Sequence, residues 1–314
     1  MADTKISLVT GGAGFIGSHL VDALLALGHK VIAVDNLVTG SDKNIEEAKK
    51  NPNFSFINAD IIASAPTVDG TVDYVFNFAS PASPVDFAKL AEEIALVNSV
   101  GTINMLRMAR DHNARYLEAS TSETYGDPKE HPQKETYFGN VNPNGIRSCY
   151  DESKRFAEAM TMVYVRKYGL DARIVRIFNT YGPRMRKDDG RVVSNFINQA
   201  LQNKLLTVYG DGTQTRSFCY VSDLVTGILT VMFADNVKGE VFNVGNPEEY
   251  QVKELARKIK EMTGSASEIT TAPLPQDDPT QRKPDITKVK IAVGWEPLVS
   301  VDEGLKKTIE FYRK

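Results

Sequence analysis

Apolar residues occur in short, nearly continuous runs in the first half of the chain, and helical patterns separate most of these runs. The runs are rich in β-branched residues, which is typical of strands buried on both faces. They predict strands at Lys5–Thr10, Lys30–Asp35, Phe54–Asn58, Tyr74–Phe78, Arg115–Ala119 and Ala172–Phe178. The intervening patterns predict helices, notably at Ile16–Leu27, Val97–His112 and Cys149–Tyr168. This alternation predicts a doubly wound α/β fold, in which helices cover both faces of a parallel sheet.

The pattern changes after about Gly182. The sequence there predicts helices at Arg191–Gln202, Ser222–Phe233 and Val252–Thr263, and a strand at Val241–Val244. The segment Pro273–Asp285 is so rich in proline and charge that we expect a loop without regular structure, either a binding lid or a linker. We therefore predict a larger domain at residues 1–182. Residues 183–314 are expected to form mainly a smaller α/β ligand-binding domain, with some segments returning to the first.

Composition excludes several classes of protein. Hydrophobic residues make up 42% of the chain and charged residues 25%, and the net charge is −3, so we expect no nucleic-acid partner. No apolar stretch approaches the ~20 residues of a membrane helix, and the start of the chain leaves no room for a secretory leader. Only two cysteines occur, which favours the cytoplasm. The four histidines lack metal-ligand spacing, so no metal is predicted.

A glycine-rich turn follows the first predicted strand. Gly11, Gly14 and Gly17 lie between this strand and the first helix, where the backbone must turn tightly and approach a pyrophosphate. Asp35 ends the second strand, which is the place of an acid that binds the ribose hydroxyls. Because a carboxylate repels a 2′-phosphate, the pattern predicts NAD rather than NADP as the cofactor.

Further cofactor contacts are expected near this turn and at the carboxyl ends of the following strands, where such contacts gather in doubly wound sheets. The candidates are Phe15, Ile16, Asn36, Thr39, Gly40, Asp60, Ile61, Ala79 and Ser80.

A Tyr-x-x-x-Lys pair, Tyr150 and Lys154, lies one helical turn apart on one predicted helix. An ammonium beside a phenol favours the phenolate and is expected to lower the tyrosine pKa. Such a phenolate accepts the proton of an alcohol while hydride leaves the same carbon. Thr121, at the end of the preceding strand, is the expected third hydroxyl that binds the alcohol. The pair also contributes to the predicted cofactor site.

Together, the glycine turn, the acid after the second strand, the Ser/Thr strand end and the Tyr-x-x-x-Lys pair resemble the extended short-chain dehydrogenase/reductase superfamily, in its NAD-dependent epimerase/dehydratase family. The resemblance covers essentially the whole chain. It implies a nucleotide-sugar substrate and a homodimer formed through a four-helix bundle of the helices at Val97–His112 and Cys149–Tyr168.

Several longer stretches resemble the UDP-glucuronate decarboxylases within this family. They are ASPASP at 79–84, ASTSETYGDP at 119–128, HPQ at 131–133, NVNP at 140–143, RSCYDESKR at 147–155, RIFNTYGPRM at 176–185, DGRVVSNFI at 189–197, YGDGTQTRSF at 209–218, GNPEE at 245–249 and DDPTQRKPDI at 277–286. The resemblance implies NAD-dependent decarboxylation of UDP-glucuronate to UDP-xylose through a 4-keto intermediate, with internal recycling of NADH.

The resemblance also assigns roles to individual residues. It places Arg282 in the active site, where a guanidinium binds the sugar carboxylate or stabilises the enolate, and it gives Glu123 a role in sugar pucker or proton relay. Ser122 replaces the aspartic acid that dehydratases usually carry before this glutamate. For the uridine diphosphate, the matching positions are Asn179, Arg191, Tyr209, Gln214 and Arg216.

Three other functions remain open from the sequence. The chain has Leu96-Val97-Asn98 where decarboxylases tend to have Lys-Thr-Asn, and it differs from the usual pattern at Phe138 and Asn144. A nucleotide-sugar 4,6-dehydratase acting on dTDP- or UDP-glucose and a UDP-sugar 4-epimerase are therefore alternatives. A non-catalytic NAD-binding scaffold is the third, although the intact Tyr150/Lys154 pair argues against it.

Overall fold

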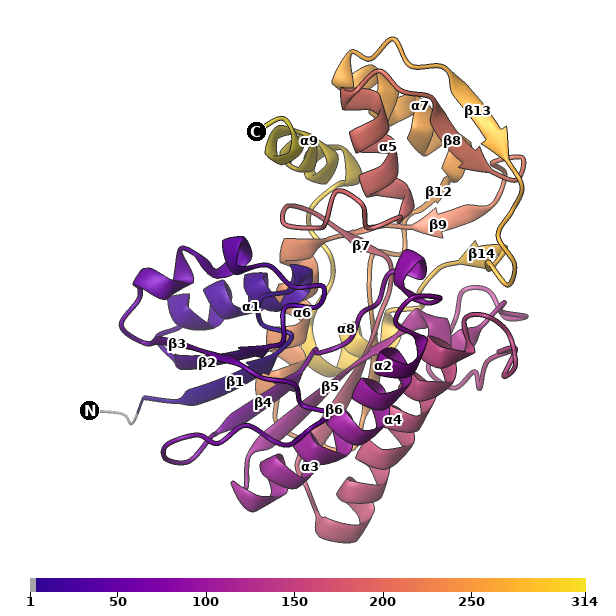
Figure 1. Cartoon of the computed structure of the whole chain (residues 1–314). Coiled ribbons are helices and arrows are strands. Elements are labelled where there is room, and N and C mark those ends of the chain that lie inside the picture. The colour runs from indigo at the N-terminus through magenta and orange to yellow at the C-terminus, as the bar shows by residue number, and fades with distance from the viewer. Residues whose placement is uncertain (1–3) are drawn as a thin grey trace.

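A seven-stranded parallel sheet forms the centre of the computed structural model, which describes residues 4–314 (Figure 1). Its strand order is β11-β6-β5-β4-β1-β2-β3. The strands are β1 (Ile6–Thr10), β2 (Lys30–Asp35), β3 (Phe54–Asn58), β4 (Tyr74–Asn77), β5 (Arg115–Thr121), β6 (Ala172–Ile177) and β11 (Val241–Val244). The order reverses beside β1, as in other doubly wound folds, so the predicted fold class is confirmed.

Helices cover both faces of this sheet. Strand residues alternate between the two faces, so Val9, Phe76 and Leu117 pack against α1 (Phe15–Ala26) and α6 (Val221–Phe233). Leu8, Val75 and Tyr116 pack on the other side, where the core includes residues of α3 (Thr102–Asp111) and α4 (Ser148–Tyr168). α2 (Ala91–Leu96) lies beside α4 on that second face.

A smaller group of elements lies at the carboxyl edge of the sheet, at the top of Figure 1. Its strands pair in the order β12-β9-β14 and as β13 with β8, and β10 pairs with β7. The elements are β7 (Thr180–Tyr181), α5 (Val192–Leu201), β8 (Leu206–Tyr209), β9 (Thr215–Ser217), β10 (Cys219–Tyr220), β12 (Glu249–Gln251), α7 (Val252–Thr263), β13 (Ile269–Ala272), β14 (Gln281–Arg282) and α9 (Val301–Tyr312). In contrast, α8 (Thr287–Val293) packs against β11 and α6. From the same half of the chain, β11 and α6 belong to the large sheet, while the division at residue 182 stays a prediction.

Two expected elements differ from the structure. The helix expected at Val97–His112 begins earlier, at Ala91, and the segment Val97–Gly101 forms a wide π-helical turn before α3. Buried Asn98 lies in this turn and donates to Ser80 and Ser153, which are contacts that hydrophobic periodicity does not reveal. The segment Pro273–Asp285 contains a strand after all, because β14 pairs with β9.

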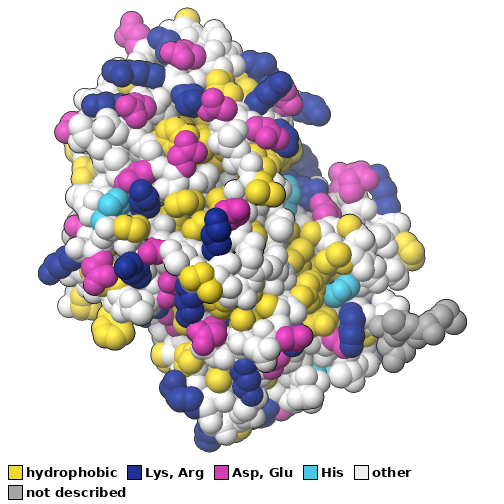
Figure 2. All heavy atoms as spheres, turned by 180° about the vertical axis from the view of Figure 1, so that it is seen from behind, with side chains coloured by type: hydrophobic (Ala, Val, Ile, Leu, Met, Phe, Trp, Pro, Cys, Tyr) yellow, Lys and Arg dark blue, Asp and Glu magenta, His cyan; other side chains and the backbone are white. Residues whose placement is uncertain are grey.

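Charges of both signs alternate over the face shown in Figure 2 rather than forming a single-sign patch. Among residues 4–314, no helix combines the length and apolar character needed to cross a bilayer. The expectation about a secretory leader partly concerns residues 1–3, which lie outside the described residues.

Candidate active site

A large cavity of about 790 Å³ lies at the carboxyl edge of the parallel sheet, where doubly wound folds bind their ligands. Nearly all of the candidates named from the sequence line it. They are Gly11, Gly14, Phe15, Ile16, Gly17, Asp35, Asn36, Thr39, Asp60, Ile61, Ala79, Ser80, Thr121, Ser122, Glu123, Tyr150, Lys154, Asn179, Arg191, Tyr209, Gln214, Arg216 and Arg282. The exception is Gly40, which lies behind Asp35: a Cβ atom there would approach Asp35 Oδ1 to 2.8 Å.

The turn between β1 and α1 leaves no room for a side chain at Gly11 or Gly17. Gly11 has a φ of +66°, and a Cβ atom on it would lie 2.6 Å from the Phe78 carbonyl oxygen. A Cβ atom on Gly17 would collide with the Gly11 carbonyl oxygen. The helix N-cap, Gly14, offers no side-chain acceptor, so the first N–H groups of α1 face the cavity edge free for an anion. This cradle fits the pyrophosphate of a dinucleotide.

Asp35 ends β2 beside this cradle. Its carboxylate oxygens accept hydrogen bonds from the backbone N–H groups of Ala13, at 3.0 Å, and Leu37, at 2.8 Å. These bonds tie the acid to the glycine turn and fix its orientation. Burial raises the pKa of Asp35, whereas the backbone hydrogen bonds oppose the shift. A carboxylate fixed in this way is suited to accept hydrogen bonds from ribose hydroxyls.

Tyr150 and Lys154 lie on α4 beside the end of β5, and both are buried. The Tyr150 ring stacks on Phe87 with 5.2 Å between centroids, and its hydroxyl group bonds with Thr121. Lys154 Nζ donates to the Ala119 carbonyl oxygen at 2.7 Å. The three expected side chains therefore all line the cavity.

The expected lowering of the tyrosine pKa is wrong for this structure. Burial raises the pKa of Tyr150 to about 12, although the hydrogen bond with Thr121 and the charge of Arg191 oppose the shift. Burial also lowers the pKa of Lys154. Burial is the main cause, and the Lys154 ammonium does not offset it, because this ammonium bonds to the strand carbonyl rather than to the phenol. The spacing of the pair along the helix does not reveal this choice of partner.

Glu123 follows Thr121 by two residues and lies between two guanidinium groups. Its carboxylate pairs with Arg147 and, at 3.0 Å, with Arg282. Arg282, almost completely buried, also donates to Ser122 Oγ at 2.8 Å and to the Gly126 carbonyl at 3.0 Å. Although burial raises the pKa of Glu123, the charges of Arg282 and Arg147 outweigh it and lower the pKa to about 2. Glu123 is therefore a carboxylate at neutral pH.

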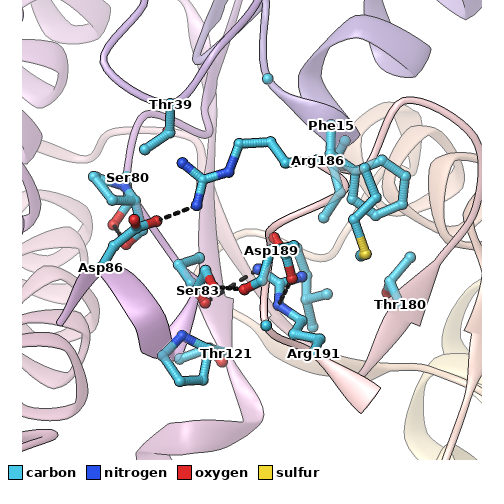
Figure 3. Close-up of a pocket in the computed structure, with 18 of the residues that line it drawn as sticks. Phe15, Thr39, Ser80, Ser83, Asp86, Thr121, Thr180, Arg186, Asp189 and Arg191 are labelled. Carbon is cyan, nitrogen blue, oxygen red and sulfur yellow. Dashed lines mark hydrogen bonds and ion pairs between the residues drawn. The ribbon is translucent and has the colours of Figure 1, made fainter. Parts of the chain in front are cut away.

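Two loops face each other across the cavity, as Figure 3 shows. Arg186 forms an ion pair with Asp86 at 2.8 Å, and the Ser83 hydroxyl donates to the Asp189 carbonyl oxygen. Arg191 Nε lies 3.2 Å from Asp189 Oδ1 and also lines the cavity. These contacts join residues 83–86 to residues 186–191 over the middle of the site.

The charged residues that line the cavity but were not predicted from the sequence include Arg147, Asp86 and Arg186. Arg147 stood inside a quoted motif, but nothing in its spacing indicated that it would pair with Glu123. Asp86 and Arg186 are 100 residues apart, and neither belonged to a recognised pattern. Arg216, which was expected on a diphosphate, pairs instead with Asp278 at 3.0 Å in this structure.

The chain is similar to known proteins of one family. The model of the NAD dependent epimerase/dehydratase family matches residues 7–245. UDP-glucuronic acid decarboxylase 1 of Xenopus tropicalis is 51% identical over 312 residues, which are 99% of this chain and 73% of that protein. UDP-glucuronic acid decarboxylase 2 of Arabidopsis thaliana is 52% identical over 307 residues, covering 98% of this chain and 68% of that protein.

The fold is also similar to that of a solved enzyme of related chemistry. The structure of UDP-glucuronic acid 4-epimerase from Bacillus cereus, in complex with UDP-glucuronic acid and NAD, superposes with a TM-score of 0.88. The two sequences are 28% identical, and the match covers 98% of this chain and 99% of the other.

Proposed function

The chain belongs to the NAD dependent epimerase/dehydratase family, and from this premise we propose that it converts UDP-glucuronate to UDP-xylose by decarboxylation, with NAD as its cofactor. One observation carries the proposal. The buried Arg282 guanidinium lies with Ser122 and Glu123 in the cavity that also holds Tyr150. An alcohol-oxidising pair and a carboxylate-binding cation thus share one site.

The cofactor site consists of the glycine turn, the N-terminus of α1 and Asp35. When bound there, NAD would supply the hydride acceptor for oxidation at C4 of the sugar and the hydride donor for the final reduction. The turn holds the pyrophosphate with backbone N–H groups, and the Asp35 carboxylate accepts hydrogen bonds from the ribose hydroxyls. Asn36, Thr39, Asp60, Ile61, Ala79 and Ser80 line the rest of this half of the cavity.

Oxidation at C4 requires a base for the hydroxyl proton. Tyr150 takes this proton, and Thr121 holds the sugar oxygen beside it. The pKa of about 12 in the protein means that the phenol needs positive charge to act as a base near neutrality. Lys154 supplies one such charge on the same helix, and the cofactor's nicotinamide ring adds another.

Decarboxylation follows from the oxidation. Once C4 is a ketone, the carboxylate on C5 belongs to a β-keto acid, and loss of CO2 leaves an enolate. A proton from solvent then returns to C5, and return of hydride to C4 and of the proton to its oxygen gives the pentose. Arg282 is placed to bind the carboxylate and then to stabilise the enolate charge. Glu123, which is ionised at neutral pH, does not donate the proton that returns to C5; we assign it the role of holding the guanidinium groups of Arg147 and Arg282.

The uridine diphosphate is assigned to the other wall of the cavity. Arg191 and Arg216 bind the diphosphate, because a guanidinium fork contacts two phosphate oxygens at once. Asn179 lies near the sugar phosphate, and Tyr209 and Gln214 border the ribose and base. Substrate binding then requires Arg216 to exchange its Asp278 contact for phosphate.

The test is a mass-resolved incubation of the enzyme with NAD and UDP-glucuronate, with UDP-glucose as the matched neutral substrate. We expect CO2 and a UDP-pentose from the acid, without net NADH, and no turnover of the neutral sugar. Loss of water from UDP-glucose would instead identify a 4,6-dehydratase, and an unchanged mass with inverted C4 a 4-epimerase. If no sugar turns over at high enzyme concentration, the decarboxylase proposal is wrong.

Assembly and location are further parts of the proposal. We propose a homodimer through the outer faces of α4 and of the α2–α3 segment, where Leu96, Val100 and Phe156 are exposed. Sedimentation of the purified protein at the mass of one chain would contradict this. We also propose a cytoplasmic location, because Cys149 and Cys219 are both free thiols. Fractionation of cells that express the chain tests the location.

A further inference from the structure

An acidic side chain is buried directly behind the Tyr150/Lys154 pair, outside the cavity lining. Glu118 lies on β5, three residues before Thr121, and is fully buried. Its Oε1 atom lies 3.6 Å from Lys154 Nζ, and the Lys154 side chain is only 4% exposed. A buried carboxylate costs several kcal/mol unless it is paired and hydrogen-bonded. Its position next to a charged lysine therefore needs an explanation.

One oxygen of this carboxylate is well satisfied. Oε2 accepts hydrogen bonds from the Tyr116 hydroxyl and from Asn77 Nδ2, the latter at 2.8 Å. Asn77 in turn accepts from the Thr10 hydroxyl at 2.8 Å, and Thr10 Oγ1 accepts from the backbone N–H of Ala79 at 3.1 Å. Glu118 is thus tied to the ends of β1 and β4, which carry the cofactor half of the cavity.

The other oxygen has no hydrogen-bond partner among residues 4–314. The cation that it faces is Lys154, whose ammonium donates to the Ala119 carbonyl on the same strand. The ammonium therefore lies between a strand carbonyl and the Glu118 carboxylate. At 3.6 Å the contact with Glu118 is an ion pair rather than a hydrogen bond.

The charges around Lys154 come from two strands and its own helix. Burial lowers the pKa of Lys154, and Glu118 on β5 is the strongest influence that raises it, followed by Glu158 on α4. Glu158 is already engaged, because it pairs with Arg176 of β6 at 2.7 Å and accepts from the Ser120 hydroxyl. The titratable groups without charge are Tyr116, which donates to Glu118, and Tyr150, which lies one turn before Lys154 on α4. Glu118 is consequently the principal counter-charge of the lysine.

We propose that Glu118 is a positioning residue for catalysis, which holds the Lys154 ammonium in place and in its charged form from behind the sheet edge. The inference rests on the proposed function only in giving Lys154 a role in oxidation. Without this counter-charge, burial would favour the neutral amine, and Tyr150 would lose the positive charge that makes it a base.

The sign of the pH effect follows directly. Activity that needs the Lys154 ammonium is lost as pH rises through the lysine pKa. An opposite charge at this range shifts a pKa by about 1–3 units. Removal of the Glu118 charge should therefore move the alkaline limb of the pH profile, where kcat falls as pH rises, to lower pH by about that amount. One pH unit above the shifted midpoint of this limb, kcat is about tenfold below its plateau value. A merely structural carboxylate would alter stability and leave the limb in place.

The experiment compares Glu118→Gln with Tyr116→Phe, which removes the hydroxyl but keeps the carboxylate. For each protein, the pH profile of kcat is measured with UDP-glucuronate, and Lys154 is titrated by NMR after labelling of lysine Cε. We expect the alkaline limb and the Lys154 midpoint to move together in Glu118→Gln and to stay near the wild-type values in Tyr116→Phe. If Glu118→Gln does not fold, the double variant Tyr116→Phe/Glu118→Leu replaces the whole hydrogen-bonded pair by apolar groups and gives the same readouts.

An unmoved Lys154 midpoint in the charge-removing variants overturns the inference, and so does an equal shift in Tyr116→Phe. The NMR titration needs no substrate, so it decides the matter even if the wild-type protein releases no CO2. In that case the proposed function is wrong, while the NMR titration of Lys154 still tests the electrostatic role of Glu118.

Discussion

The cavity has a cofactor wall, formed by the glycine turn and Asp35, and a sugar wall, formed by Glu123 with Arg147 and Arg282. The two walls are built in different ways. On the cofactor wall, the contacts that shape the site are backbone contacts: glycines that admit no Cβ atom, and an acid that bonds to the N–H groups of Ala13 and Leu37. On the sugar wall, Glu123 pairs with Arg147 and Arg282, which lie 24 and 159 residues away in the sequence. Backbone geometry thus determines the first wall, whereas long-range ion pairs between side chains determine the second.

The difference has an energetic consequence. The glycine turn is complete before any ligand arrives, because its donors are part of a helix end. The arginines of the sugar wall are already neutralised by Glu123, Asp189 and Asp278. An anionic substrate must therefore compete with protein carboxylates, and changes on this wall should affect both stability and activity.

The largest effect is expected where the two walls meet, at Tyr150. Tyr150→Phe removes the base for the C4 hydroxyl, so we expect kcat for CO2 release to fall by about 10²–10⁴-fold. NAD affinity should remain, because the glycine turn and Asp35 are unchanged. Tyr137→Phe is the control, since this tyrosine lies outside the cavity lining. Full activity in Tyr150→Phe would place the chemistry on another group.

A substitution of Arg282 changes the sugar wall and leaves the residues of the cofactor wall unchanged. Arg282→Leu removes the cation from Ser122 and Glu123, and we expect kcat/KM for UDP-glucuronate to fall by about 10²–10³-fold. Because it breaks a buried ion pair, it should also destabilise the fold by about 3–5 kcal/mol, measured by urea unfolding. Arg282→Lys keeps the charge but not the guanidinium fork and should lose less. Arg257→Ala, an exposed change outside the cavity, controls for the loss of an arginine.

The same contrast explains what the sequence could predict. Strand ends and glycines follow from local periodicity, so the parallel sheet, the turn at Gly11 and the acid at Asp35 were predictable from chemistry alone. Arg282 was predictable only from resemblance to a family, because its segment reads as an irregular loop and gains its strand only by pairing with β9. Arg147 and the buried Glu118 were missed, since a side chain's partner across the fold leaves no periodic signal.

Acid pH should destabilise the sugar wall through protonation of Glu123. The pKa of Glu123 lies at about 2, below the usual value of 4.5. Its ionic contacts therefore contribute stability above the unfolded-state pKa, and this contribution is lost as pH falls from about 5 towards 2. The lowered pKa of Glu123 corresponds to a contribution on the order of 3 kcal/mol to the free energy of unfolding.

Urea unfolding between pH 2 and pH 6 measures this contribution. The wild-type free energy of unfolding should fall more steeply over this range than that of Glu123→Gln, which has no carboxyl to titrate. Glu47→Gln serves as the control, because Glu47 forms only an exposed ion pair with Lys50. Parallel curves for the wild type and Glu123→Gln would show that the two guanidinium groups do not stabilise this acid.

Asp35 gives the smallest expected effect and the sharpest test of the cofactor wall. Asp35→Asn removes the charge that repels a 2′-phosphate, so we expect the ratio of the NADP and NAD dissociation constants to fall about tenfold, equivalent to about 1.4 kcal/mol. One carboxylate oxygen also becomes an amide that cannot accept from Ala13 or Leu37, so NAD binding should weaken slightly. Calorimetric titration with both cofactors measures the ratio, and Asp42→Asn, an exposed change outside the cavity, should leave it unaltered. An unchanged ratio in Asp35→Asn would mean that the ribose hydroxyls do not reach this carboxylate, and that the backbone of the turn alone defines the cofactor wall.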